Sequence, residues 1–122
     1  MPRVERNEVR EYRIDTEVIV DAYDEVEQAL GWYYYLNEKL TFPFLAGCIA
    51  KRAISPLSMG DEVKVIGMSH EEECEHEMFV KICWKRKALA VPLSQLAVID
   101  VNEQTREAVE DWHYWVNRGY QF

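Results

Sequence analysis

The residues with the clearest chemistry lie between His70 and Glu77, where the chain reads HEEECEHE. Five carboxylates fall within seven consecutive positions, and no Lys or Arg lies between Lys64 and Lys81. Carboxylates this close repel one another and destabilise the segment unless a positive charge compensates them. Calcium is a hard ion that takes about six to eight oxygen ligands, which carboxylates and carbonyls on a flexible loop can supply. The segment therefore predicts a calcium site with the candidate ligands Glu71, Glu72, Glu73, Glu75 and Glu77.

A single loop rarely supplies every ligand of a calcium ion, so further oxygens should come from elsewhere in the chain. The best candidates are Asn37 and Glu38, at the end of the first predicted helix. Asp21, Asp24 and Glu25 form a second acidic group at the start of that helix. Capping and the positive end of the helix dipole explain their position. They become secondary candidate ligands if folding brings them beside another carboxylate.

Two other interpretations of the acidic segment stay open. It lacks the spacing of an EF-hand loop, and a solvated acidic hairpin would need no ion. Zinc is the rival ion, because His70, Cys74 and His76 offer softer ligands. A closed zinc site needs a fourth strong ligand, and Cys48 and Cys83 lie in apolar runs that are typical of core residues.

Two strands and a helix are predicted to position the acidic segment. Strands are predicted over Glu62–Met68, where Val63 and Val65 alternate with polar residues, and over Met78–Trp84, where every second residue from Val80 is apolar. The acidic segment between them is therefore predicted to be the loop of a hairpin. A helix is predicted from residue 22 to about residue 40, before Pro43. Its spacing turns Tyr33 inward and leaves Trp32, Tyr34 or Tyr35 to pack elsewhere. The apolar face of this helix consists of Ala22, Val26, Ala29, Leu30, Tyr33, Leu36 and Leu40.

The remaining elements complete an α+β fold. Gly60–Val65 and Ala90–Leu96 resemble the strands of an SH3-like barrel, so we expect a small SH3-like β-barrel or antiparallel sheet packed with an N-terminal and a C-terminal helix. One domain should span 1–122, with a helical part over about 21–55, a β part over about 60–101 and the last helix over about 102–118. Before the first helix, residues 1–13 are predicted to be loose and Ile14–Val20 to form a strand. After it, we expect a helical or extended stretch over Leu45–Ile54 and strands over Ala88–Val91 and Ala97–Val101. A final helix is predicted to begin after its cap, Asn102, and to end at Gly119.

Composition narrows the partners of the protein. The chain has 22 acidic and 14 basic residues, a formal charge of −8 and a pI near 4.9. Such a surface repels nucleic acid and anionic membranes and favours cations or a basic protein. Three cysteines without a CxxC pair fit a reducing compartment. The charged N-terminal segment does not resemble a signal peptide and no apolar run is long enough for a membrane span, so a cytoplasmic location is expected.

Enzymatic chemistry is not expected. Asp111 and His113 are two positions apart on a predicted helix and cannot face one another well. The carboxylates around Cys74 disfavour its thiolate, and no phosphate loop or nucleophile motif is present. A last acidic group on the C-terminal helix is explained as a solvated face; it consists of Glu103, Glu107, Glu110 and Asp111.

Several segments in a fixed order resemble the cyanobacterial calcium-binding proteins called CcbP, over nearly the whole chain. They are Val20–Glu25, Gly31–Leu36, Phe42–Phe44, Glu71–Val80, Leu89–Leu96 and Asp111–Trp115. The resemblance implies a small acidic protein that binds calcium without EF-hands and buffers, sequesters or senses intracellular calcium. In filamentous relatives it implies a link to heterocyst differentiation. The alternative is an SH3-like interaction module that presents its acidic patch to a basic partner.

Overall fold

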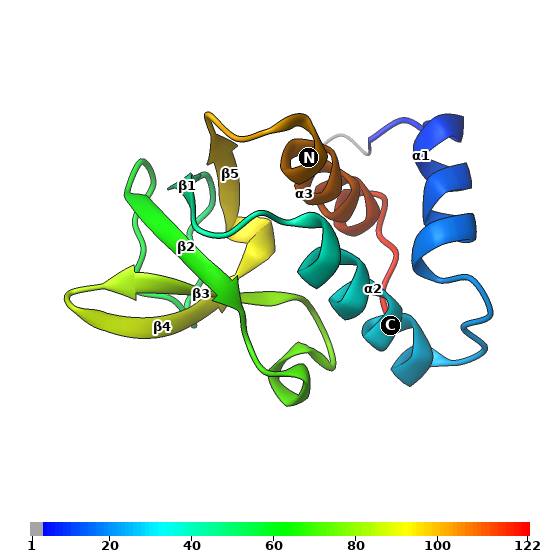
Figure 1. Cartoon of the computed structure of the whole chain (residues 1–122), viewed down its shortest axis with the longest axis horizontal. Coiled ribbons are helices and arrows are strands. Elements are labelled where there is room, and N and C mark those ends of the chain that lie inside the picture. Colours follow the sequence, from blue (N-terminus) through cyan, green and yellow to red (C-terminus); the bar gives the residue numbers. More distant parts are fainter. Residues whose placement is uncertain (1–3) are drawn as a thin grey trace.

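A five-stranded antiparallel sheet forms one side of the protein, whose computed structural model describes residues 4–122 (Figure 1). The sheet order is β4-β3-β2-β1-β5. Within the described residues the outer strands β4 and β5 do not pair, so the sheet is not closed into a barrel. The α+β expectation is confirmed, with an open antiparallel sheet. The strands are β1 (Phe44–Cys48), β2 (Glu62–Met68), β3 (Phe79–Trp84), β4 (Lys87–Pro92) and β5 (Leu96–Ile99).

Three α-helices lie beside the sheet: α1 (Glu8–Arg13), α2 (Glu25–Lys39) and α3 (Glu103–Asn117). In Figure 1, α2 and α3 lie between the sheet and α1, and this arrangement buries one continuous core. Its aromatic centre joins Trp32 of α2 to Trp112 of α3, with ring centroids 5.0 Å apart. None of the described helices is long and apolar enough to cross a membrane.

The N-terminal part differs from the sequence prediction. Ile14–Val18 forms a π-helical turn that continues α1, not a strand, and it buries Ile14 and Val18 against the core. Residues 8–13, expected to be loose, form α1 and are held to α3. The β-branched side chains favoured a strand locally, whereas tertiary packing selects the helix. Residues 1–3 lie outside the described part of the chain.

Asp111 accounts for the attachment of α1. Arg10 Nη1 donates to Asp111 Oδ1 at 2.6 Å, and Arg13 Nε donates to Asp111 Oδ2 at 2.7 Å. Tyr35 Oη of α2 donates to the same Oδ2 at 3.0 Å. Asp111 is fully buried, so the prediction that it belongs to a solvated acidic face is wrong.

Helix α2 starts three residues later than predicted, at Glu25. Asp24, not Asp21, is its N-cap, and the Asp24 side chain accepts a hydrogen bond from Glu27 N at 2.8 Å. Trp32 and Tyr35 are buried, whereas Tyr33 is only half-buried. The predicted inward face was therefore wrong in part, because α2 packs against α3 on one side and against the acidic loop on another.

Gly31 allows α2 to approach the π-helical turn closely. A Cβ at this position would overlap the carbonyl oxygen of Val18. Alanine would otherwise stabilise a helix interior by up to about 1 kcal/mol, but here we expect Gly31→Ala to lower the free energy of unfolding by about 1–3 kcal/mol. Gly67→Ala is the control, because a Cβ at Gly67 meets no atom within 4 Å. Urea unfolding that finds the two variants equally stable would contradict this packing.

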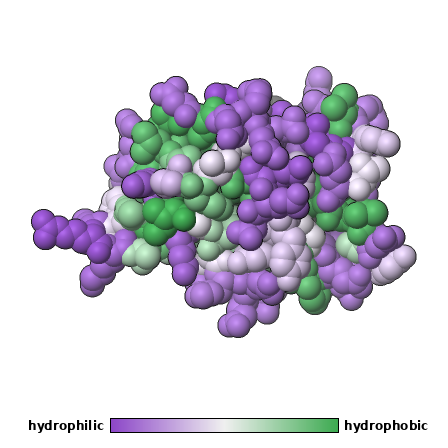
Figure 2. All heavy atoms as spheres, viewed as in Figure 1, coloured by the Kyte–Doolittle hydropathy of each residue, from purple (hydrophilic) through white to green (hydrophobic). Residues whose placement is uncertain are grey.

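The acidic segment is the loop of the β2–β3 hairpin, as predicted. Val65 pairs with Ile82 and Met68 pairs with Val80, so both strands run directly into the loop. The chain around it is mostly hydrophilic in the space-filling view, with separate hydrophobic patches (Figure 2). The two strands therefore hold the ends of the loop, and Glu71, Glu72, Glu73 and Glu75 are exposed whereas Glu77 is half-buried.

Candidate metal site

The acidic loop has an ordered backbone. Glu71–Cys74 forms a 3-10 turn, η2, and Cys74 is its buried residue. Phe79 N donates to Cys74 Sγ at 3.3 Å, so the thiol closes the loop against the start of β3. Burial raises the pKa of Cys74, which keeps it a neutral thiol. Ser69 Oγ donates to Glu73 Oε1, and this hydrogen bond lowers the pKa of Glu73.

Two tyrosines of α2 attach the loop to the helix. Tyr33 Oη donates to the carbonyl oxygen of Ser69 at 2.7 Å. Tyr34 Oη donates to Glu71 Oε1 at 2.8 Å, and this hydrogen bond to a carboxylate raises the pKa of Tyr34. The sequence placed Tyr33 and Tyr34 on the predicted helix but did not reveal this role, because only the fold shows which hydroxyl meets the loop.

A cavity of about 380 Å³ lies between the loop and the first half of α2. Apolar side chains and the buried thiol form part of its lining. Four of the lining residues carry carboxylates, three of them from the loop and Glu25 from α2. As far as residues 4–122 are concerned, no Lys or Arg lines it. The lining residues are Glu25, Val26, Ala29, Leu30, Tyr33, Glu71, Glu72, Cys74, Glu75, His76 and Phe122.

The two other loop glutamates are engaged elsewhere. Glu73 accepts the Ser69 hydroxyl, and Glu77 Oε1 lies 3.1 Å from Arg52 Nη2. Neither is among the residues that line the cavity. Asn37 and Glu38 are exposed on the last turn of α2, also outside that lining.

The secondary acidic group is divided by the fold. Asp21 is exposed in a turn with a positive φ of 59°, and Asp24 is the N-cap of α2. Glu25 alone of the three lines the cavity with the loop carboxylates. Of this group, Glu25 is therefore the residue that shares a cavity with loop carboxylates, and it stays a candidate ligand.

The donor set suits a hard cation better than zinc. Carboxylate oxygens are the ligands that calcium prefers, whereas Cys74 would have to give up its place in the loop and its proton to bind zinc. Within the described residues, no three His, Cys, Asp or Glu side chains converge as a ready-made ion cluster. The carboxylates are spread around the cavity and their side chains are exposed, with Glu71 held by the Tyr34 hydroxyl.

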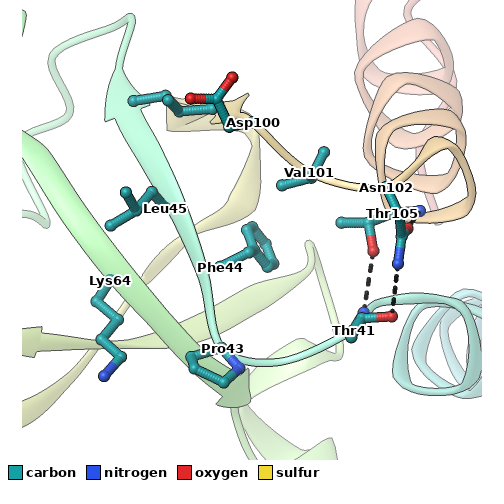
Figure 3. Close-up of a pocket in the computed structure, with 10 residues that line it drawn as sticks. Thr41, Pro43, Phe44, Leu45, Lys64, Asp100, Val101, Asn102 and Thr105 are labelled. Atoms are coloured by element: carbon teal, nitrogen blue, oxygen red, sulfur yellow. Dashed lines mark hydrogen bonds between the residues drawn. The ribbon is translucent and has the colours of Figure 1, made fainter.

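A second cavity, of about 400 Å³, lies beside β1 and has different chemistry (Figure 3). Lys64 and Asp100 are the charged residues of its lining among those described. Its hydroxyl and amide groups already bond one another: Thr41 N donates to Thr105 Oγ1 at 3.0 Å, and Asn102 Nδ2 donates to Thr41 Oγ1 at 3.0 Å. These bonds join the start of β1 to α3, which is a structural role.

Comparisons with known proteins indicate a calcium-binding family. The Calci_bind_CcbP family model, whose description is calcium binding, matches residues 12–116. The crystal structure of Anabaena CcbP is 43% identical, covers 100% of both chains and superposes with a TM-score of 0.88. A calcium-binding protein in its calcium-binding form is 44% identical, again over 100% of both chains, with a TM-score of 0.85. A comparison with curated proteins finds no match. The chain therefore belongs to the CcbP family of calcium-binding proteins.

Proposed function

We propose that this protein is a single calcium-binding domain and that it holds the ion with carboxylates around the cavity between α2 and the acidic loop. The observation that supports the proposal is that Glu25 lines one cavity together with Glu71, Glu72 and Glu75. Four negative charges with no Lys or Arg in the described lining attract a divalent cation, and its binding relieves their mutual repulsion. Backbone carbonyls and water supply the remaining oxygens.

We infer a buffering role rather than a sensing role. A sensor needs an element with two arrangements that the ion can select between. Here the loop backbone is held by Tyr33 at Ser69 and by Cys74 at Phe79. Binding therefore requires rotation of exposed glutamate side chains more than movement of the backbone. Intracellular calcium homeostasis, a cytoplasmic location and a link to heterocyst differentiation belong to this proposal and rest on the family resemblance.

Calorimetric titration with calcium tests the proposal, together with thermal unfolding in calcium and in chelator. An ion that binds only the folded state at 100 times its Kd adds about 2.7 kcal/mol to the free energy of unfolding, so the melting temperature should rise. Magnesium should bind more weakly, because a loop does not easily enforce a tight octahedron. No binding heat and an unchanged melting temperature at millimolar calcium would remove the proposal.

Two further measurements distinguish a calcium buffer from a calcium sensor and from a protein-interaction module. A buffer should show nearly the same near-ultraviolet circular dichroism and dye binding with and without calcium, whereas a sensor exposes new apolar surface. Capture of a basic protein that persists in chelator, in a chain with no calcium heat, would favour the interaction-module alternative.

A further inference from the structure

The turn between β3 and β4 concentrates positive charge in an otherwise acidic protein. Lys85, Arg86 and Lys87 are consecutive and exposed, and within the described residues they form no salt bridge. Several arginines elsewhere are paired, such as Arg13 with Asp111 and Arg52 with Glu77, whereas the lysines of the described residues form no salt bridge; residues 85–87 differ from the other unpaired basic residues in being three in a row. We call residues 85–87 the basic tip. It lies at the far left of Figure 1, where Figure 2 shows a hydrophilic projection.

The basic tip is also strained. Lys85 and Arg86 have positive φ values of 48° and 69°, as both central residues of a type I′ hairpin turn require. Asn-Gly is the favoured pair at these positions, and a left-handed residue that is not glycine costs about 1–2 kcal/mol. Basic side chains therefore occupy the one turn of this hairpin where smaller residues would fold better. Strain that is retained in this way is typical of functional surfaces.

The acidic loop is the surface of opposite charge on the same chain, but it lies too far away to contact the basic tip. Strand β3 runs from the acidic loop at one end to the basic tip at the other. Its six residues separate the two by about 20 Å. This separation exceeds the Debye length of about 8 Å at physiological ionic strength, so neither charge cluster neutralises the other within one molecule.

We propose that the basic tip docks against the acidic loop of a second copy of this chain. The contact is heterologous, because each copy uses its tip on one neighbour and offers its loop to another, and such contacts build chains or rings. The ammonium and guanidinium groups of the tip would pair with the exposed carboxylates of Glu71, Glu72 and Glu75. Lys85 also lies over the Trp84 ring, with Nζ 5.7 Å from the ring centroid, which orients it at the tip.

Calcium regulation of this contact rests on the proposed function. An ion at the acidic loop removes the negative charge that attracts the tip, so calcium and a neighbouring copy compete for one surface. The calcium-free protein should therefore associate and the calcium-loaded protein should disperse.

Sedimentation velocity in chelator tests the contact, at an ionic strength of about 10 mM where the Debye length is about 30 Å. The mean mass of the wild-type protein should rise with concentration and fall back when salt is added. The variant K85N/R86G creates the favoured turn, so it should melt at the same or a higher temperature while the dissociation constant rises about tenfold or more. The control K39Q/K51Q removes equal charge elsewhere and should associate like the wild type.

Each outcome decides the proposal. A wild-type protein that stays monomeric in chelator at every concentration overturns it, and so does K85N/R86G associating as well as the wild type. Calcium that binds at the loop by calorimetry yet leaves the association unchanged overturns the docking at that loop. Absence of any calcium heat would count against the proposed function instead, and the contact would then be judged by the K85N/R86G comparison alone.

Discussion

Replacing Asp111 by alanine is expected to lower the free energy of unfolding by about 3–5 kcal/mol, the largest stability effect that we expect for a single substitution in this protein. Its carboxylate is fully buried and binds Arg10, Arg13 and Tyr35. Truncation would leave the two guanidinium groups, which are themselves largely buried, without their shared counter-ion. It would also weaken the attachment of α1 to α3, which keeps the hydrogen bond that Tyr114 Oη donates to Glu11 Oε2 at 2.7 Å.

Urea unfolding of three variants measures this effect. Asp111→Asn keeps the shape of the side chain and some of its hydrogen bonds but removes the charge. It should therefore lower the free energy of unfolding by less than Asp111→Ala does. Glu107→Ala is the control: Glu107 also approaches Arg13, at 3.5 Å, but is 53% exposed, and it should cost about 1 kcal/mol or less. Equal losses for Asp111→Ala and Glu107→Ala would show that the buried pairs do not hold the N-terminal helix.

Changing Glu25, Glu71, Glu72 and Glu75 together to glutamine should weaken calcium binding by about 100-fold or more, because calcium affinity depends strongly on the charge of its ligands. Glutamine has nearly the same size as glutamate, so the loss of calcium affinity would be due to the removed charge and not to altered packing. The calcium-free variant should melt at or above the temperature of the calcium-free wild type, since the repulsion around the cavity is gone. Calorimetry with calcium gives the affinity, and thermal unfolding in chelator gives the stability.

Two matched variants make this test specific. Glu73→Gln with Glu77→Gln removes two loop charges that are engaged by Ser69 and Arg52, and calcium affinity should change only a few-fold. A second control changes four exposed glutamates outside the cavity, Glu5, Glu17, Glu62 and Glu103, and should leave binding nearly intact. Loss of calcium in the Glu73 and Glu77 variant, with binding retained in the cavity variant, would move the site to the other end of the loop.

Local signals in the sequence predicted much of the fold. Alternation over Glu62–Met68 and the β-rich run before Trp84 gave the hairpin correctly, and Asn102 caps α3 through its bond to Thr105 N at 2.8 Å. These features depend on neighbouring residues alone. The strand predicted over Ile14–Val20 failed because the helix there is selected by burial against α2, which no local pattern contains.

The sequence by itself determined that carboxylates crowd one hairpin loop and that the chain resembles a calcium-binding family. Charge density and segment order are properties of the linear chain, so both could be recognised without coordinates. Only the tertiary structure decided that Glu25 lines the same cavity as the loop, that Glu77 is engaged by Arg52, and that Asp111 is buried rather than solvated. Each of these depends on residues far apart in the chain being brought together by packing, and the energy of an ionised group is set by those distant neighbours.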